Sequence, residues 1–408
     1  MKAVQFNYSF LRYVLCKTVG KFLPSLHWNS QLSCLHYSDI PEPALPNNEW
    51  VKIKVKYGGI CGSDINLIFL RDSPALSPFT SFPFTLGHEL VGVITEVGSE
   101  VKHVIPGDRV VIDPVLSCET RGISRPCAAC QHGDFSLCEH MTDGHVSPGL
   151  LVGTCHDTGG SWSPYLVAHQ SQVFKLPPEI NDINGVMVEP FSCALHSVLR
   201  NPPKNHDTVF IIGAGVIGLC IIAAIRALGI SCRIIVLAKH DYQAELASHY
   251  GADEVIRLTS KNRYFPKAAS SLHAKLLTPI FGSSIAQGGA DITFECVGKE
   301  SSIHDALRLT KSGGKVILLG LAGILNKIDW TTVWLNELTV KGSFAYSTEK
   351  YEGKKTRTYD IAIELMAKGK VDLSPLITHR FPLEQYKRAI SIASNKGQEA
   401  VVKVVFEH

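Results

Sequence analysis

Several features that would define a particular class of protein are missing from this chain. No stretch reaches the roughly eighteen apolar residues that a membrane span needs, so we expect no transmembrane helix. Lysine and arginine form no long block, and a net charge of only +3 makes a nucleic-acid partner unexpected. Internal repeats and low-complexity tracts are absent. The start, Met1–Phe6, is typical of an opening strand rather than a secretory signal, so we expect a cytoplasmic location.

The composition that remains is that of a large globular protein. The 408 residues are 45% hydrophobic and 19% charged, and this length favours two domains over a single core. Twelve cysteines are present, and three of them cluster as Cys127, Cys130 and Cys138. A closely spaced cysteine pair in a chain of this size favours metal binding over a disulfide framework.

The pattern of strands and helices changes along the chain. From Trp50 to about Val173, short Val/Ile strands alternate with Gly/Pro turns, which predicts a β-rich domain. From about residue 190, apolar strands alternate with helical stretches, which predicts an α/β unit with a parallel sheet. The chain ends on a predicted strand, Ala400–Phe406. We therefore expect a β-rich domain made of residues 1–189 and 345–408, with a doubly wound Rossmann domain at 190–344.

Residues 10–28 form an unusual segment. Apolar residues recur there at helical spacing, and three cations lie between them: Leu11, Val14, Leu15, Val19, Phe22 and Leu23, with Arg12, Lys17 and Lys21. The pattern predicts an extra helix that packs on its own domain or on a neighbouring subunit. A basic amphipathic helix that touches a membrane surface is the alternative.

A glycine motif indicates a dinucleotide site. Gly213-Ala214-Gly215-Val216-Ile217-Gly218 follows an apolar strand and opens an apolar helix. Gly213 allows the tight turn, Gly215 lets the backbone approach a pyrophosphate, and Gly218 lets helix and strand pack closely. The first helical turn, at Val216 and Ile217, offers free N–H groups and a positive dipole end to the phosphates.

The end of the next strand distinguishes an NAD site from an NADP site. An Asp or Glu about 20 residues beyond the motif would hold the ribose 2′-hydroxyl of NAD. Ala238 occupies that place and is followed by Lys239 and His240. Without a carboxylate to repel a 2′-phosphate, NADP is favoured and NAD stays possible. The alternative is that Lys239 is an ordinary surface residue.

Three short segments carry the residue types that bind zinc. They are Cys61-Gly62-Ser63-Asp64, Gly87-His88-Glu89 and Glu189-Pro190. Thiolate, imidazole and carboxylate are zinc ligands, and a catalytic zinc takes three of them plus an open position. In this order, with the glycine motif and the later Asp291–Gly298 and Gly313–Val316, they resemble the zinc-containing medium-chain dehydrogenase/reductase family. The resemblance covers almost the whole chain and implies that the β-rich domain is a GroES-like catalytic domain.

The resemblance also implies a role for each residue. Cys61 and His88 match zinc ligands, and Glu89 matches a carboxylate that binds zinc in some members. Glu189 matches a ligand position, and Ser63 matches the hydroxyl residue that passes on the substrate proton. Zinc would lower the pKa of an alcohol so that a hydride can leave to the nicotinamide.

Two positions depart from the family pattern. Asn66 stands where close relatives often have a His that ends the proton relay, and Asn does not titrate near neutral pH. Leu67 stands where polyol-specific relatives have a Tyr, and aromatic residues lie nearby at Phe79, Phe82 and Phe84. We expect a more apolar pocket mouth than a sugar site would have.

A second, structural zinc is expected in the cysteine-rich segment. Cys127, Cys130 and Cys138 match three of the family's four cysteines, and the usual first position is Ser124. Cys118 follows a family-like approach sequence and would supply the fourth thiolate across an insert at 119–124. Four thiolates make a closed site. The alternatives are a site of three cysteines with His132 or water, or no metal.

These features lead to a ranked set of functions. The first is a zinc- and NADP-dependent secondary-alcohol dehydrogenase or carbonyl reductase acting on a small alcohol or carbonyl compound. The second is an NAD-dependent polyol or amino-alcohol dehydrogenase. The third, from a different class, is a non-catalytic dinucleotide-binding sensor or interaction protein. The resemblance further implies a homodimer or homotetramer.

Overall fold

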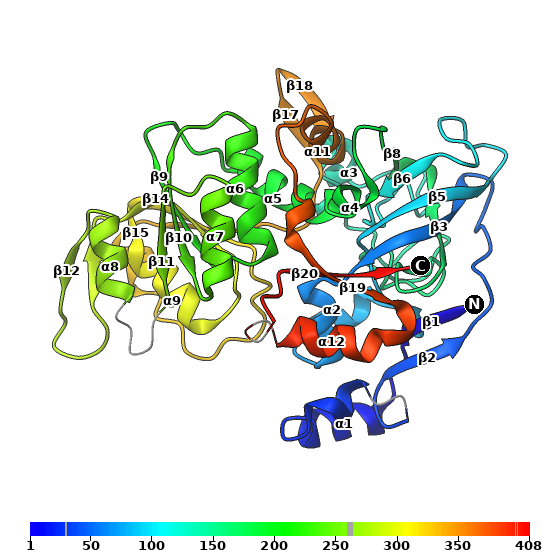
Figure 1. The fold of residues 1–408 in the computed structure, drawn as a ribbon, viewed down its shortest axis with the longest axis horizontal. Helices are drawn as coiled ribbons and strands as arrows, with labels where there is room; N and C mark the ends of the chain where they lie inside the picture. Colours follow the sequence, from blue (N-terminus) through cyan, green and yellow to red (C-terminus); the bar gives the residue numbers. More distant parts are fainter. Residues whose placement is uncertain (29–30, 259–263, 396, 398) are drawn as a thin grey trace. The chain divides into compact units, whose positions relative to one another are not determined.

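A computed structural model describes residues 1–408 apart from 29–30, 259–263, 396 and 398. The chain divides into two compact units (Figure 1). Unit 1 comprises Met1–Glu189, Tyr346–Thr348 and Gly353–His408, and unit 2 comprises Pro190–Ala345 and Glu349–Glu352. The chain therefore does not return from unit 2 to unit 1 at one point near residue 345. It enters unit 1 at Tyr346, returns to unit 2 for the hairpin residues Glu349–Glu352, and enters unit 1 again at Gly353.

Unit 2 contains a parallel sheet of six strands. They run in the order β11-β10-β9-β14-β15-β16. In chain order the strands are β9 (Thr208–Ile212), β10 (Arg233–Ala238), β11 (Glu254–Arg257), β14 (Ala290–Glu295), β15 (Thr310–Leu318) and β16 (Thr339–Gly342). The order reverses between β9 and β14, which defines a doubly wound sheet and a point where ligands bind. The predicted Rossmann fold is confirmed.

One helix precedes the first of these strands, and further helices connect them. They are α5 (Val188–Arg200), which begins in unit 1, and α6 (Val216–Ala227), α7 (Asp241–His249), α8 (Tyr264–Ser271), α9 (Glu300–Leu309) and α10 (Thr331–Leu335). A small antiparallel pair, β12 (Lys275–Leu277) with β13 (Ile285–Gln287), lies between β11 and β14. Buried residues of α8 and α9, such as Phe265 and Ile303, share one core cluster with Phe210 and Ile235 of the sheet. The strands read as continuous apolar runs because both faces of the sheet are buried.

Unit 1 is dominated by a seven-stranded, mostly antiparallel sheet. Its order is β19-β20-β3-β5-β6-β8, and β7 also pairs with β3. The strands are β3 (Trp50–Gly59), β5 (Leu90–Val97), β6 (Arg109–Ile112), β7 (Tyr165–His169), β8 (Val173–Lys175), β19 (Ile377–Pro382) and β20 (Lys403–Glu407). In β3, buried Val51, Ile53 and Val55 alternate with more exposed lysines, the period of a strand with one buried face. The last strand begins at Lys403 rather than at the predicted Ala400, which has a left-handed φ of 52°.

Shorter elements surround this sheet. A three-stranded sheet contains β2 (Leu35–Asp39), β1 (Lys2–Phe6) and β4 (Phe84–Thr85). A hairpin joins β17 (Thr348–Tyr351) and β18 (Lys354–Arg357). The helices are α2 (Gly62–Ile68), α3 (Ala128–His132), α4 (Asp182–Gly185), α11 (Thr358–Ala367) and α12 (Tyr386–Ser394). Short 3-10 turns are η2 (Pro74–Phe79), η3 (Phe135–Leu137), η4 (Gln170–Gln172), η6 (Ser374–Leu376) and η7 (Leu383–Gln385).

The segment 10–28 is not one helix. It forms α1 (Phe10–Val19) and the 3-10 helix η1 (Pro24–Trp28), separated by a turn at the buried Gly20. Cys16 and Leu26 join the core of unit 1, whereas most of the predicted apolar face points outward. Among the described residues, no helix is long and apolar enough to cross a bilayer.

Candidate functional site

The structure gathers three of the predicted zinc-binding residues in unit 1. Cys61 caps the N-terminus of α2, and His88 and Glu89 directly precede β5. The ligand atoms of these three side chains lie within 4.8 Å of one another. His88 and Glu89 are buried and Cys61 is half-buried, so the group opens toward the outside on the thiol side.

A buried carboxylate, Asp64, organises this group. Its Oδ2 accepts the backbone N–H of Cys61 at 2.8 Å, and its Oδ1 lies 3.8 Å from Nδ1 of His88. Burial opposes the charged form of His88, but Asp64 and the Cys61 thiol outweigh it and hold the pKa of His88 well above its usual range. Asp64 lies within the first zinc motif of the sequence, but the motif predicts no role for it.

A buried lysine in β20 faces the same group. Lys403 forms an ion pair with Glu89 and donates to the carbonyl oxygen of Ile60 at 3.1 Å. Burial favours the neutral amine, yet Glu89 and Cys61 keep the pKa of Lys403 raised. Leaving either partner alone in this interior would be costly. The signal for Lys403 in the sequence is a single cation within the apolar run Val401–Phe406.

Glu189 lies in the first turn of α5, outside the group of three. Its Oε1 accepts a hydrogen bond from the hydroxyl of Tyr346 at 3.1 Å. Burial raises the pKa of Glu189 to about 7, although His88 and Lys403 favour its ionised form. Tyr346 is fully buried, and no motif in the sequence singled it out.

Helix α2 carries the remaining predicted residues of this region. The hydroxyl oxygen of Ser63 is buried and has no hydrogen-bond partner among the described residues. Such an orphaned group is uncommon and fits a site that receives a polar atom from a ligand. Asn66 and Leu67 are half-buried on the same helix. Phe84, in contrast, is buried against Phe6 in the core, so its predicted place at a pocket mouth is wrong.

The four cysteines of the second predicted site also converge. The sulfur atoms of Cys118, Cys127, Cys130 and Cys138 lie within 4.8 Å of one another. Backbone N–H groups point at three of them, Cys127 N–H at Cys118 Sγ (3.3 Å), Glu139 N–H at Cys127 Sγ (3.5 Å) and His140 N–H at Cys138 Sγ (3.4 Å). A hydrogen bond from Cys130 lowers the pKa of Cys138 to about 5, which favours a thiolate. His132 bonds the carbonyl of Ala128 instead and lies outside this group.

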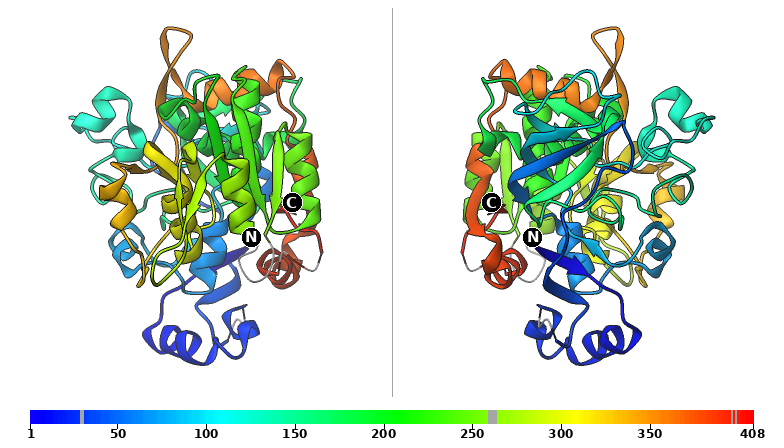
Figure 2. Two further views of the ribbon diagram at one scale, coloured as in Figure 1. Left: turned by 90° about the vertical axis from the view of Figure 1, so that its left-hand side faces the viewer. Right: turned by 90° about the vertical axis from the view of Figure 1, so that its right-hand side faces the viewer.

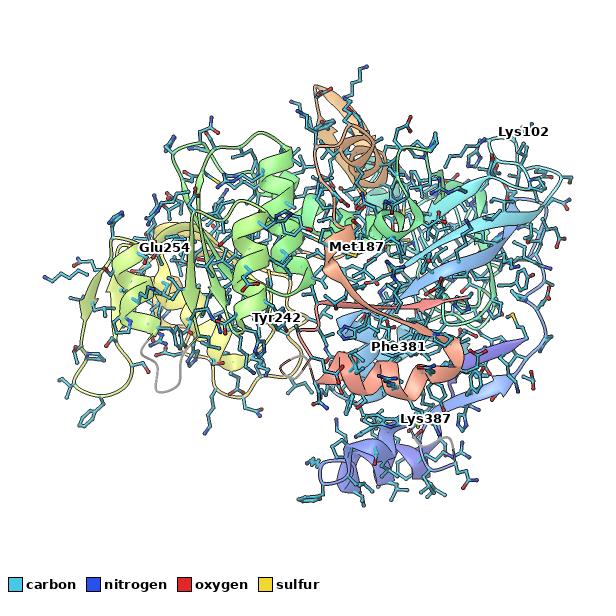
Figure 3. All side chains as sticks on the ribbon, viewed as in Figure 1. Lys102, Met187, Tyr242, Glu254, Phe381 and Lys387 are labelled. Carbon is cyan, nitrogen blue, oxygen red and sulfur yellow. The ribbon has the colours of Figure 1, made fainter. Side chains whose placement is uncertain are left out.

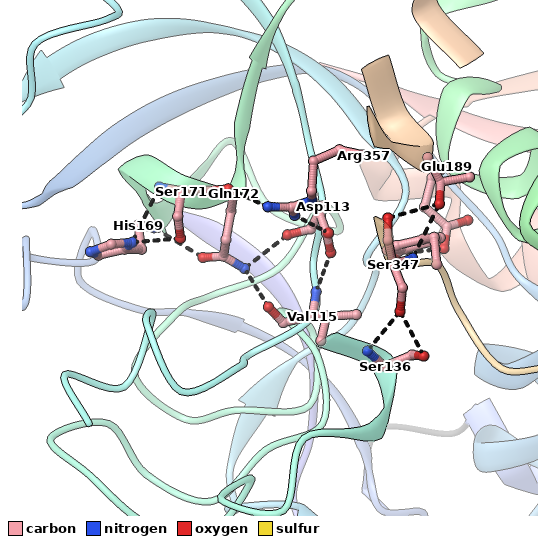
Figure 4. Close-up of polar contacts among 11 residues, drawn as sticks. Asp113, Val115, Ser136, His169, Ser171, Gln172, Glu189, Ser347 and Arg357 are labelled. Carbon is pink, nitrogen blue, oxygen red and sulfur yellow. Dashed lines mark hydrogen bonds and ion pairs between the residues drawn. The ribbon is translucent and has the colours of Figure 1, made fainter. Parts of the chain in front are cut away.

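The cysteine lobe, residues 118–138, is hydrogen-bonded to the segment that holds Glu189 (Figure 4). The backbone N–H of Ser136 donates to the hydroxyl oxygen of Ser347 at 3.2 Å, and the two hydroxyl groups are hydrogen-bonded to each other at 3.0 Å. Ser347 directly follows Tyr346 in the chain. In the middle of the view, Arg357 forms an ion pair with Asp113 at 2.5 Å. The lobe and the Glu189 contact therefore share one polar network within unit 1.

The glycine motif of unit 2 adopts the geometry that a dinucleotide needs. Gly213 has a left-handed φ of 102°, and α6 begins at Val216 with Gly215 as its N-cap. A side chain on Gly218 would collide with the carbonyl of Gly213, so only glycine permits this approach of helix and strand. A Cβ on Gly215 would meet nothing within 4 Å, which leaves its backbone open to a ligand.

The end of β10 is positively charged. Ala238 is buried there, and Lys239 and His240 follow it. Arg257, at the end of the adjacent β11, donates to the carbonyl of Lys239 at 2.9 Å and pairs with Asp241. Burial, then the charges of Lys239 and Arg257, lower the pKa of His240. The sequence does not predict a role for Arg257, because only the strand pairing brings it beside Ala238.

A dinucleotide-binding sheet and a thiol–imidazole–carboxylate group define a metal-dependent oxidoreductase class. Residues 47–178 match the family described as Alcohol dehydrogenase GroES-like domain, and residues 216–367 match Zinc-binding dehydrogenase. L-idonate 5-dehydrogenase of Vitis vinifera is 31% identical over 358 residues, 87% of each chain. Sorbitol dehydrogenase of Arabidopsis thaliana is 30% identical over 356 residues, 87% of this chain and 88% of that protein.

Solved structures agree with this assignment. A protein described as a short chain alcohol dehydrogenase of E. coli CFT073, complexed with NADH, has a TM-score of 0.73 at 25% identity and covers 100% of this chain and 99% of that one. A zinc-binding dehydrogenase of Sinorhizobium meliloti bound to NADP has a TM-score of 0.69 at 27% identity with the same coverage. The chain belongs to the zinc-containing dehydrogenase family. It is an oxidoreductase that uses zinc and a nicotinamide dinucleotide to interconvert an alcohol and a carbonyl compound.

Proposed function

We propose that the catalytic centre is the Cys61–His88–Glu89 group and that the enzyme acts on secondary alcohols or their ketones. The observation that carries this proposal is the convergence of the three ligand types within 4.8 Å beside the orphaned hydroxyl of Ser63. Zinc bound here would act as a Lewis acid on the substrate oxygen. Cys61 and His88 with one carboxylate, Glu89 or Glu189, supply three ligands and leave a position open.

The chain's own residues then divide the remaining work. Asp64 orients the His88 imidazole, since a carboxylate behind a ligating histidine sets its ring position and basicity. Lys403 balances the charge of Glu89. Ser63 accepts the substrate proton and passes it to solvent, because Asn66 does not titrate near neutral pH.

The substrate class is the first open choice. The relatives named for L-idonate and sorbitol favour the alternative of a polyol dehydrogenase. Leu67, half-buried on α2, argues against a site lined with hydroxyl-binding groups. Because the chain belongs to a family of dehydrogenases, the hypothesis of a non-catalytic sensor is not favoured. Rates on a panel of apolar secondary alcohols, polyols and amino alcohols with each cofactor would decide between the two enzyme hypotheses.

We favour NADP as the cofactor. Lys239 and Arg257 place two cations at the end of β10, where a 2′-phosphate would lie, and Ala238 offers no carboxylate. Arginine can bind a phosphate through two parallel hydrogen bonds. The Asp241 carboxylate would repel a 2′-phosphate, but it is paired with Arg257, and this ion pair reduces the repulsion.

The remaining expectations concern the second metal, the assembly and the compartment. The four thiols of the cysteine lobe would hold a structural zinc. A homodimer is supported by β16 at the edge of the described part of the unit 2 sheet and by exposed Trp334 and Leu335 nearby. A cytoplasmic location is supported by twelve free cysteines.

The decisive test is the Cys61→Ala variant. We expect it to lose one zinc and nearly all turnover while unit 2 still binds dinucleotide, as measured by quenching of protein fluorescence. Full activity at unchanged zinc content would disprove the proposed catalytic centre. The control is Cys155→Ser, because Cys155 is buried and lies in neither group.

A further inference from the structure

The N-terminal segment α1–η1, residues 10–28, presents an apolar surface that unit 1 leaves uncovered. Leu11 is 79% exposed and Phe22 is 89% exposed. Other large apolar side chains on the same segment are also exposed, namely Phe10, Val14, Val19 and Leu23. Several large apolar side chains exposed on one short segment indicate a contact surface.

Phe10, Leu11 and Val14 share one side of α1, and the exposed Val19, Phe22 and Leu23 lie at or beyond its C-terminal end. Positions 10, 11 and 14 are neighbours on a helical surface, and Cys16 on the opposite side is buried in the core of unit 1. Tyr13 and Leu15 pack partly against that core. The inward contacts hold the segment in place, so its outward face is a feature of the folded chain. Figures 1 and 2 both show α1 at the end of unit 1, beyond β1 and β2.

The charges within this sequence segment have a single sign, and Asp72 of unit 1 lies near Lys17. From Asn7 to Ser38 the sequence contains Arg12, Lys17 and Lys21 and no Asp or Glu. Asp39, the next acidic residue, is paired with Lys2 at 2.5 Å. Lys387 on α12 is exposed and lies on the side of unit 1 from which α1 projects (Figure 3).

We propose that the outward face of α1–η1 docks reversibly on an anionic lipid surface. Apolar side chains of a short amphipathic segment can insert at the boundary between headgroups and acyl chains while nearby cations meet lipid phosphates. A second copy of the chain is the less suitable occupant. Lys17 donates to the carbonyl oxygen of Leu70 in unit 1, but a symmetric contact of this face would set Lys21 against the same cation of the other copy. A short segment with few cations predicts weak, salt-sensitive binding.

The test is co-sedimentation of the 408-residue, zinc-loaded protein with vesicles. One vesicle type is phosphatidylcholine alone and the other is an equal mixture with phosphatidylglycerol. We expect binding to the anionic vesicles only, with loss at about 0.5 M salt. Leu11→Ser/Phe22→Ser should weaken binding at least about tenfold, and Lys21→Ala about fivefold, without changing turnover.

The matched control is Phe281→Ser. Phe281 is 90% exposed in unit 2, and its variant should bind vesicles as the parent protein does. Parent protein that stays in the supernatant with both vesicle types would overturn the proposal. So would a double variant that binds like the parent. Sedimentation velocity tests whether a second copy of the chain is the occupant. If the parent protein binds neither vesicle type and forms an assembly that the double variant does not form, a second copy covers this face.

Discussion

The hydroxyl of Tyr346 donates a hydrogen bond to Oε1 of Glu189 across 157 residues of sequence, at 3.1 Å. Both side chains are buried. Ser347, the next residue, bonds to Ser136 of the cysteine lobe. Tyr346 thus joins a carboxylate that we propose as a zinc ligand to the lobe that we propose as a second zinc site.

The first prediction removes this hydrogen bond. Tyr346→Phe should lower zinc affinity or kcat/KM about tenfold to hundredfold, because residues that orient metal ligands carry effects of this size. Zinc content after dialysis and steady-state rates would measure it. Tyr359→Phe is the control, since the Tyr359 ring packs edge-on against Tyr346 at 4.9 Å. Equal zinc retention and rates in Tyr346→Phe and the parent would contradict this role.

The second prediction concerns pH. In the metal-free protein, Asp64 and Cys61 outweigh burial and hold the pKa of His88 raised, so a proton competes with zinc for the imidazole. Zinc affinity should therefore rise with pH, about tenfold per unit for each proton displaced. The charged His88 stabilises the metal-free fold fully below its unfolded pKa, and this contribution disappears as the pH rises through the higher folded pKa.

Competition with a chromophoric chelator between about pH 6 and 9 would measure this dependence. Asp64→Asn removes the charge that holds the proton on His88. We expect this variant to move the rise in zinc affinity to lower pH. An affinity that does not change with pH in the parent protein would contradict the prediction.

The third prediction concerns the cysteine lobe. Cys130→Ser should reduce the zinc content from about two to one per chain, since one open and one closed site are expected. It should also lower Tm by about 10 °C or more, because a structural zinc contributes folding free energy directly. Turnover below the unfolding temperature should change less than stability. If the parent protein binds only one zinc per chain when fully loaded, Cys118 does not supply the fourth thiolate of the lobe.

The fourth prediction concerns the choice of cofactor. Lys239→Ala and Arg257→Ala should each weaken NADP about tenfold to hundredfold and leave NAD almost unchanged, because a charge-assisted hydrogen bond contributes about 1.5–3 kcal/mol. Ala238→Asp should shift preference toward NAD. The ratio of kcat/KM for the two cofactors measures both effects.

Arg233→Ala is the matched control for this experiment. Arg233 begins the same strand, β10, and pairs with Glu254 at 2.9 Å, so its loss should cost stability without changing the cofactor ratio. A parent enzyme that prefers NAD, with an unchanged ratio in Lys239→Ala, would contradict our interpretation of the strand end.

Local patterns in the sequence were sufficient for the fold class. The apolar strand Thr208–Ile212, the glycines that follow and the helix from Val216 form a contiguous unit, and the structure has all three. Such motifs are predictable because their turn and close packing depend on neighbouring residues. The segment 10–28 was less predictable, because helical spacing shows an apolar face without showing whether the domain covers it.

The sequence by itself determined the family, the Rossmann motif and the residues that can bind metal, since each is a local pattern of residue types at characteristic spacings. Only the tertiary structure brought Lys403 to Glu89, Tyr346 to Glu189 and Arg257 to the end of β10. These partners are up to 314 residues apart in the sequence, as for Glu89 and Lys403 (403 − 89). Strand pairing and packing place them together, and burial then makes their charges depend on one another.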